Sequence, residues 1–112
     1  MVEGATLRAA VTVLPEALAQ LGDADDWWRE HRLDAPDLLL EEWTQAMRLL
    51  EEQPIIGHAA ALPHHLRLRI LLMPQTLKHV WYETSADERE VLVLALWGAV
   101  RGEAPLLPRT DR

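Results

Sequence analysis

The sequence of 112 residues contains no cysteine, which excludes a disulfide framework and a thiolate metal site. This absence suits a reducing compartment, and we expect a cytoplasmic protein. Long apolar runs are lacking as well: Ile70–Met73 and Val91–Trp97 fall far short of the roughly 20 residues that span a bilayer. The N-terminus, Met1–Gly4, has no basic region followed by an apolar stretch, so we expect no signal peptide and no membrane partner. The 49% of hydrophobic residues suffice for the core of one domain.

An excess of positive charge is also absent, since the formal net charge is −7. This balance argues against broad attraction to nucleic acid and against direct, sequence-specific DNA binding. The charge is uneven: residues 1–53 hold 12 acidic residues and 4 arginines, whereas residues 54–112 hold 7 basic and 6 acidic residues. An anionic target would therefore have to meet the C-terminal half, and the acidic half is expected to be mainly a solvated helical surface.

Motifs for cofactors and hydrolytic chemistry are missing. The sequence has no Gly-rich phosphate loop, no Gly-x-Ser-x-Gly elbow and no His-Glu-x-x-His string. The adjacent His64 and His65 point apart in an extended segment, and His58 has no second ligand at helical spacing. We expect no metal and no cofactor.

The first half of the chain predicts one strand and two helices. Thr6–Leu14 is rich in β-branched and apolar residues and is stopped by Pro15. From Glu16 to His31 the apolar spacing becomes helical, with one face formed by Ala17, Leu21, Ala24, Trp28 and His31. The doublet Trp27–Trp28 cannot point one way on a helix, so one ring should enter the core and the other should stay partly exposed.

The second helix has clearer boundaries. Asp34 is a suitable N-cap, Pro36 fits the first turn, and Pro54 ends the helix. Its apolar stripe comprises Leu39, Trp43, Ala46 and Leu50. Because only Arg32–Leu33 joins the two helices, we expect an antiparallel helical hairpin.

The second half of the chain changes to a period of two. The expected strands are Leu66–Leu72, Thr76–Glu83 and Arg89–Trp97, separated by turns at Pro74–Gln75 and Ser85–Glu88. Val91–Trp97 has no polar residue and should lie in the middle of the sheet, covered on both faces. The segment from 101 to 112 should be an irregular or extended tail.

These elements predict an α+β fold of order β-α-α-β-β-β. The helical hairpin packs on one face of a small, mainly antiparallel sheet. Arg67 and Arg69 alternate with Leu66, Leu68 and Ile70, and we expect the two arginines on the face that the helices leave open.

Four local strings, in this order, resemble the RelE/ParE superfamily of bacterial toxins. They are Leu49–Gly57, with leucines followed by Pro and Gly; Leu68–Thr76, an arginine-led strand and turn; His79–Tyr82, an apolar-aromatic-tyrosine strand; and Val93–Pro105, a last strand with an arginine and a Gly-x-x-Pro tail. The resemblance, closer to ParE-like members, covers residues 6–105. It implies a toxin domain over 1–105 and a short tail over 106–112.

The resemblance implies the toxin of a type II toxin–antitoxin module, with roles in growth inhibition and plasmid stabilization, held inactive by a cognate antitoxin. ParE-like members inhibit DNA gyrase, whereas RelE-like members cut mRNA on the ribosome. Here His79 stands where RelE-like members usually carry arginine, and Leu106–Leu107 stands where a catalytic Tyr or His is expected. We therefore favour inhibition of gyrase by binding.

Two alternatives stay open. One is a ribosome-dependent mRNA interferase that uses Arg69, His79, Tyr82 and Arg101 as its catalytic set. The other is a non-toxic interaction module of the same fold, because the acidic balance is unusual for this superfamily.

The candidate binding residues form two groups. The target-binding candidates are Arg67, Arg69, Lys78 and Arg101, and the antitoxin-binding candidates are Trp27, Trp28, Leu106 and Leu107. Structural roles compete with each of these. Arg69 could pair across the sheet with Glu83 or Glu90 for under about 1 kcal/mol, Arg101 could be a solvated tail residue, and Tyr82 could be an anchored core aromatic.

Overall fold

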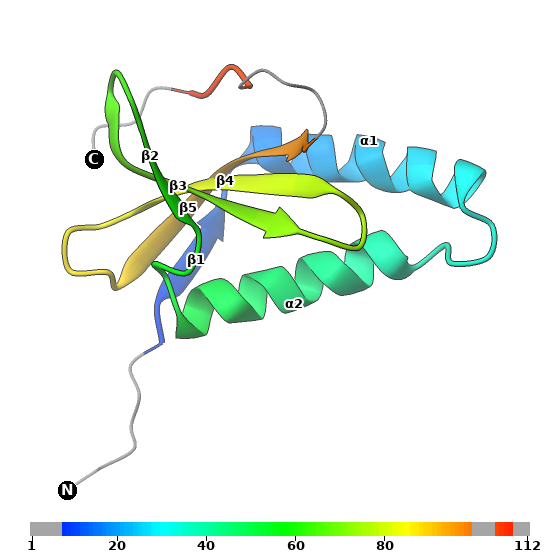
Figure 1. Cartoon of the computed structure of the whole chain (residues 1–112), viewed down its shortest axis with the longest axis horizontal. Helices are drawn as coiled ribbons and strands as arrows, with labels where there is room; N and C mark the ends of the chain where they lie inside the picture. The colour runs from blue at the N-terminus through cyan, green and yellow to red at the C-terminus, as the bar shows by residue number, and fades with distance from the viewer. Residues whose placement is uncertain (1–7, 100–104, 109–112) are drawn as a thin grey trace, which may run out of the picture.

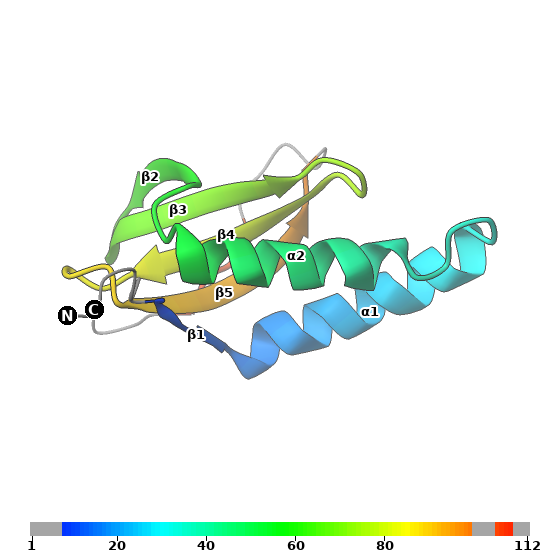
Figure 2. The same ribbon diagram turned by 90° about the horizontal axis from the view of Figure 1, so that it is seen from below.

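Two helices lie side by side against one face of a five-stranded sheet (Figures 1 and 2). This computed structural model describes residues 8–99 and 105–108. The elements are β1 Ala10–Val13, α1 Pro15–His31, α2 Leu38–Glu52, β2 His58–Leu62, β3 His65–Met73, β4 Lys78–Thr84 and β5 Glu90–Gly98. The strand order is β1-β5-β4-β3-β2, with β1 parallel to β5 and every other pair antiparallel. The predicted α+β class and the succession of strand, two helices and meander are confirmed.

One strand was not predicted. β2 pairs with β3 from His58↔Ile70 to Leu62↔His65, with a register shift between Ala60 and Leu62. The alanines of this segment gave no alternating pattern, and we expected no element there. The meander therefore has four strands, and β2 forms one edge of the sheet.

The link between the helices is longer than predicted. α2 begins at Leu38, and Asp37 rather than Asp34 is its N-cap residue, without a side-chain cap. Pro36 disfavours helical backbone at Ala35. The carbonyl of Ala35 instead accepts a hydrogen bond from the Trp28 indole Nε1 at 2.8 Å. The link thus anchors the end of α1, and the Asp34 cap was a wrong prediction.

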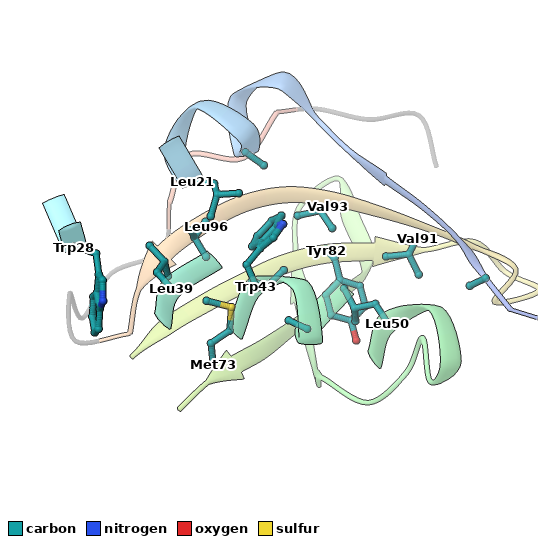
Figure 3. Close-up of a cluster of buried hydrophobic side chains, with 14 residues drawn as sticks. Leu21, Trp28, Leu39, Trp43, Leu50, Met73, Tyr82, Val91, Val93 and Leu96 are labelled. Carbon is teal, nitrogen blue, oxygen red and sulfur yellow. The ribbon is translucent and has the colours of Figure 1, made fainter. Parts of the chain in front are cut away.

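The main core lies between the helices and the sheet. It runs from Trp28 at one end to Val91 at the other (Figure 3). The helices contribute Ala17, Leu21, Trp28, Leu39, Trp43, Ala46 and Leu50; the strands contribute Met73, Val80, Tyr82, Val91, Val93 and Leu96. The amphipathic stripes predicted for both helices therefore face the sheet, except that His31 of the first stripe is exposed and stacks on Trp27.

A buried carboxylate ties α2 to the β3–β4 turn. Glu42 is only 6% exposed. Its oxygens accept hydrogen bonds from the backbone N–H of Gln75 at 2.8 Å, from the backbone N–H of Thr76 at 2.9 Å and from the Thr76 hydroxyl at 2.6 Å. Three donors satisfy this carboxylate, so its burial positions the helix over the sheet rather than leaving a charge unpaired.

β5 lies inside the sheet, between β1 and β4, and is covered on both faces, as predicted, although the middle strand of the five is β4. Val91, Val93 and Leu96 belong to the helix-side core, whereas Leu92, Leu94 and Ala95 belong to a second cluster on the far face. The change of phase occurs where Trp81 pairs with Ala95 and Tyr82 pairs with Val93, a register shift that marks a β-bulge.

The far face of the sheet differs from the prediction. We expected it to present Arg67 and Arg69 to solvent, but it carries a second apolar cluster made of Leu68, Trp81, Leu92, Leu94 and Ala95. Arg69 is in phase with Leu71, which packs against the helix-side core. The alternation of β3 was interpreted correctly, but both of its rows contain leucine, so the sequence could not tell which row meets the helices.

Within the described residues, no helix is long and apolar enough to cross a membrane.

Candidate interaction surfaces

Arg69, Tyr82 and Gly57 form one hydrogen-bonded unit on the helix side of the sheet. Arg69 Nη1 donates to the carbonyls of Ile55 at 2.9 Å and Gly57 at 2.7 Å. The backbone N–H of Gly57 donates to the Tyr82 hydroxyl at 2.9 Å. A Cβ at position 57 would lie 2.8 Å from both the Tyr82 hydroxyl and the carbonyl oxygen of Ile70. The position therefore requires glycine, and the unit fixes the chain that leaves α2.

The environment of Tyr82 keeps its phenol neutral. The side chain is fully buried, and burial raises the pKa of Tyr82, while the Gly57 N–H and the Arg69 guanidinium act in the opposite direction. Its hydroxyl oxygen accepts from Gly57 and lies away from solvent. This geometry makes Tyr82 an anchor of the core.

The residues of the interferase hypothesis do not converge. Val80 and Tyr82 belong to the helix-side core, and Trp81 belongs to the far-face cluster, so His79 is in phase with Trp81 on the far face. Arg69 and Tyr82 are together but are engaged in the unit with Gly57. Arg101 lies outside the described residues.

Arg69 has a structural role, which was one of the alternatives, but through backbone carbonyls rather than through a cross-strand ion pair. In the part of the chain that the structure describes, its hydrogen-bond partners are backbone carbonyls rather than Glu83 or Glu90. Glu83 instead contacts His65, whose Nδ1 lies 2.9 Å from Glu83 Oε2, and both side chains are buried. The contact between His65 and Glu83 was not predicted, because His65 lies at the irregular start of a strand and the direction of its side chain could not be inferred.

The target-binding candidates do not form one patch. Arg67 is exposed and lines a shallow depression together with Arg69, Ile55 and Ser85. Lys78 lies at the other end of the β3–β4 hairpin, paired with Met73. Arg101 is again outside the described residues. The structure therefore brings together two of the four cations, Arg67 and Arg69.

The two tryptophans of α1 have different roles, as predicted. Trp28 is buried, and Trp27 is 47% exposed and stacks on His31 with 4.3 Å between ring centroids. The Arg32 guanidinium lies 5.3 Å from the Trp27 centroid and 5.5 Å from the Trp28 centroid. Trp27 lines a groove beside α1, together with Asp23, Lys78 and Trp97. Of the pair, Trp27 is the one available to a partner.

The leucines of the tail are also divided. Leu106 is 96% exposed, whereas Leu107 packs against the far-face cluster. Leu106 is thus available for contact, and Leu107 is part of the fold in the free chain.

A groove between α2 and β3 was not predicted. Its floor and walls include Ala46, Leu49, Leu71 and Met73, and Arg48 and Glu52 lie at its rim. Pairing of β3 with β2 ends at Ile70 within the described residues, so the last part of β3 is an open edge beside this groove. β3 is longer than β2, so part of its edge stays open. The sequence could not show this difference in length, because β2 was not predicted.

The comparisons with known proteins bear on the fold. No family model matches the sequence, and no curated protein matches it. Among solved structures, the chain is similar to a chain of the chromosomal ParDE TA system from P. aeruginosa, with a TM-score of 0.62 and 14% identity. The similarity covers 81% of this chain and 96% of that chain. The protein therefore has a fold that occurs in a ParDE toxin–antitoxin system.

Proposed function

We propose that this chain is the toxin of a toxin–antitoxin module, of the ParE-like kind, and that it inhibits a cellular target by binding. The support is the order of strand, two helices and meander, together with the similarity to nearly the whole of a chain from a ParDE system. The four sequence strings that resemble the RelE/ParE superfamily point the same way.

The observation that favours binding over bond cleavage is the internal use of Arg69 and Tyr82. Metal-free cleavage of RNA needs a cation for the charged phosphorane and groups that move protons. Arg69 donates to two backbone carbonyls and Tyr82 accepts from Gly57, so both side chains stabilise the fold. His79, on the opposite face of β4, cannot reach the same phosphate.

The target proposed is DNA gyrase, in keeping with the ParE-like resemblance. Arg67 is exposed and lines the same depression as Arg69 and Ser85. It can contact an acidic part of a protein target without the broad positive field that a ribosome-bound nuclease needs.

The antitoxin is proposed to occupy the groove between α2 and β3. An extended segment can pair with the open edge of β3 and place apolar side chains against Leu49 and Leu71. The acidic N-terminal half, with 12 acidic residues and 4 arginines over residues 1–53, favours a basic partner segment and speeds its encounter. The exposed Trp27 and Leu106 are further contact candidates.

The test is a supercoiling assay with purified gyrase and purified chain. We expect the chain to block supercoiling, and we expect Arg67→Glu to weaken the block. Arg48→Glu is the matched control, because Arg48 lies at the rim of the α2–β3 groove and should leave the block unchanged. Full supercoiling together with cleavage of mRNA on ribosomes would establish the interferase alternative, and full supercoiling without cleavage or growth arrest would establish a non-toxic module.

A further inference from the structure

The far face of the sheet has a core of its own. Leu68, Leu94 and Ala95 are at most 1% exposed there, although both helices lie on the other side of the sheet. A sheet face of this apolar character needs a cover. Part of that cover is the short segment Pro105–Pro108, which lies on the side of the sheet away from α2 (Figure 1).

This cover is held weakly. Pro105–Pro108 has no regular secondary structure, and none of the hydrogen bonds found among the described residues involves it. Pro105 is buried and Leu107 packs against the cluster, whereas Leu106 is 96% exposed. The packing of Leu107 therefore holds this part of the tail on the sheet.

A polar group in this cluster lacks its partner. Trp81 is 8% exposed, and its indole Nε1 has no hydrogen-bond acceptor among the described residues. Buried indole N–H groups usually find an acceptor, and leaving one unpaired is unfavourable. Trp81 occupies the middle of β4, between Ile70 of β3 and Ala95 of β5. An occupant that supplied a carbonyl oxygen here would complete the site.

We propose that the far-face cluster around Trp81 is a docking site for an extended, apolar segment of the protein target, and that Pro105–Pro108 covers it in the free chain. The tail shows that an extended segment with an apolar side chain fits this face. A backbone carbonyl of the incoming segment accepts the Trp81 N–H, which the tail leaves unpaired. This inference rests on the proposed function: the depression that Arg67 lines also includes Leu68 of the far-face cluster, so one target can contact both, away from the antitoxin groove between α2 and β3.

The cover is tested first, without any partner. Leu107→Asp removes the apolar contact, and Leu106→Asp places the same charge on the exposed neighbour. With 8-anilinonaphthalene-1-sulfonate as the probe of apolar surface, we expect a several-fold rise in dye fluorescence for Leu107→Asp only. Equal fluorescence from both variants and the parent chain would overturn the role of the tail as a cover.

The docking site is tested by growth arrest at measured expression levels. Trp81→Phe keeps an aromatic ring but removes the N–H, so about 3- to 10-fold more chain should be needed for arrest, as expected for the loss of one hydrogen bond. Trp43→Phe, in the helix-side core on the other face of the sheet, is the matched control and should act like the parent chain at equal folded levels. Leu107→Asp should arrest growth at lower levels than Leu106→Asp, because its tail no longer competes.

The outcomes separate the two proposals. If the parent chain does not arrest growth, the proposed function is wrong and the docking site falls with it. If the parent arrests growth but Trp81→Phe and Leu107→Asp match their controls, only the docking site is overturned. Thermal unfolding of each variant verifies that it is folded, and Leu107→Asp, which changes a half-buried tail residue, keeps the test open should Trp81→Phe fail to fold.

Discussion

Removal of a single oxygen atom, by Tyr82→Phe, distinguishes an anchor from a catalytic acid. The Tyr82 ring is fully buried in the core, and the phenylalanine ring can occupy the same space. The change leaves the buried N–H of Gly57 without the acceptor that lies 2.9 Å away. Gly57 cannot turn away easily, because its backbone is held against Ile70 and its carbonyl accepts from Arg69.

The magnitude follows from the lost acceptor. An unsatisfied buried donor costs about 1–3 kcal/mol in the free energy of unfolding. For a domain of this size, that cost corresponds to a fall in the melting temperature of roughly 4–12 °C. Arg69→Met removes the neighbouring donor, and because both changes affect Gly57, the double variant should show a coupling free energy of about 0.5–3 kcal/mol.

The assay is urea unfolding of the parent, the two single variants and the double variant, with growth arrest measured per folded molecule. We expect Tyr82→Phe to lose stability and to keep its inhibitory activity. An unchanged unfolding free energy would refute the hydrogen-bonded anchor. A stable Tyr82→Phe variant without activity would instead assign Tyr82 to chemistry.

Three further predictions concern buried polar groups. Because burial raises the pKa of Tyr82, the unfolded chain ionises first as the pH passes about 10. The stability of the parent chain should therefore fall as the pH rises above that value, and the stability of Tyr82→Phe should fall less. Urea midpoints at alkaline pH measure this difference, and parallel pH profiles of the two chains would contradict it. Tyr82 is the only tyrosine, so its ionisation is observable directly. Glu42→Ala should cost about 3 kcal/mol because three donors lose their acceptor, against under about 0.5 kcal/mol for exposed Glu41→Ala; similar melting temperatures for both would refute this. His65→Ala should cost about 1–3 kcal/mol because it removes a buried hydrogen-bond partner of Glu83 Oε2, and a cost below about 0.5 kcal/mol would contradict this.

The helices and most strands could be predicted from the spacing of apolar residues and from the residues that end each element. The apolar residues of both helical stripes and the continuous apolar run of β5 face the core as predicted, because each pattern has one structural solution. His31, at the end of the first stripe, is exposed instead. The prediction of the sheet face on which Arg67 and Arg69 lie was wrong, because both rows of β3 contain leucine and the helices could pack on either row. β2 was missed because an alanine run has no preferred face.

The candidate site was less accessible to sequence reasoning than the fold. The unit of Gly57 and Tyr82 joins residues 25 positions apart, and the pair of His65 and Glu83 joins residues 18 apart, so no local spacing indicates either. The Trp27–Trp28 doublet was the exception, since helical geometry alone requires the two rings to diverge.

The most direct test of whether the chain is a toxin acting by binding is the count of viable cells after its induced expression, alone and together with the product of the adjacent reading frame. We expect viability to fall when the chain is expressed alone, to be restored by the co-expressed neighbour, and to fall equally for Tyr82→Phe at matched folded levels. Undiminished viability with the chain alone, or a loss of killing confined to Tyr82→Phe, would contradict it.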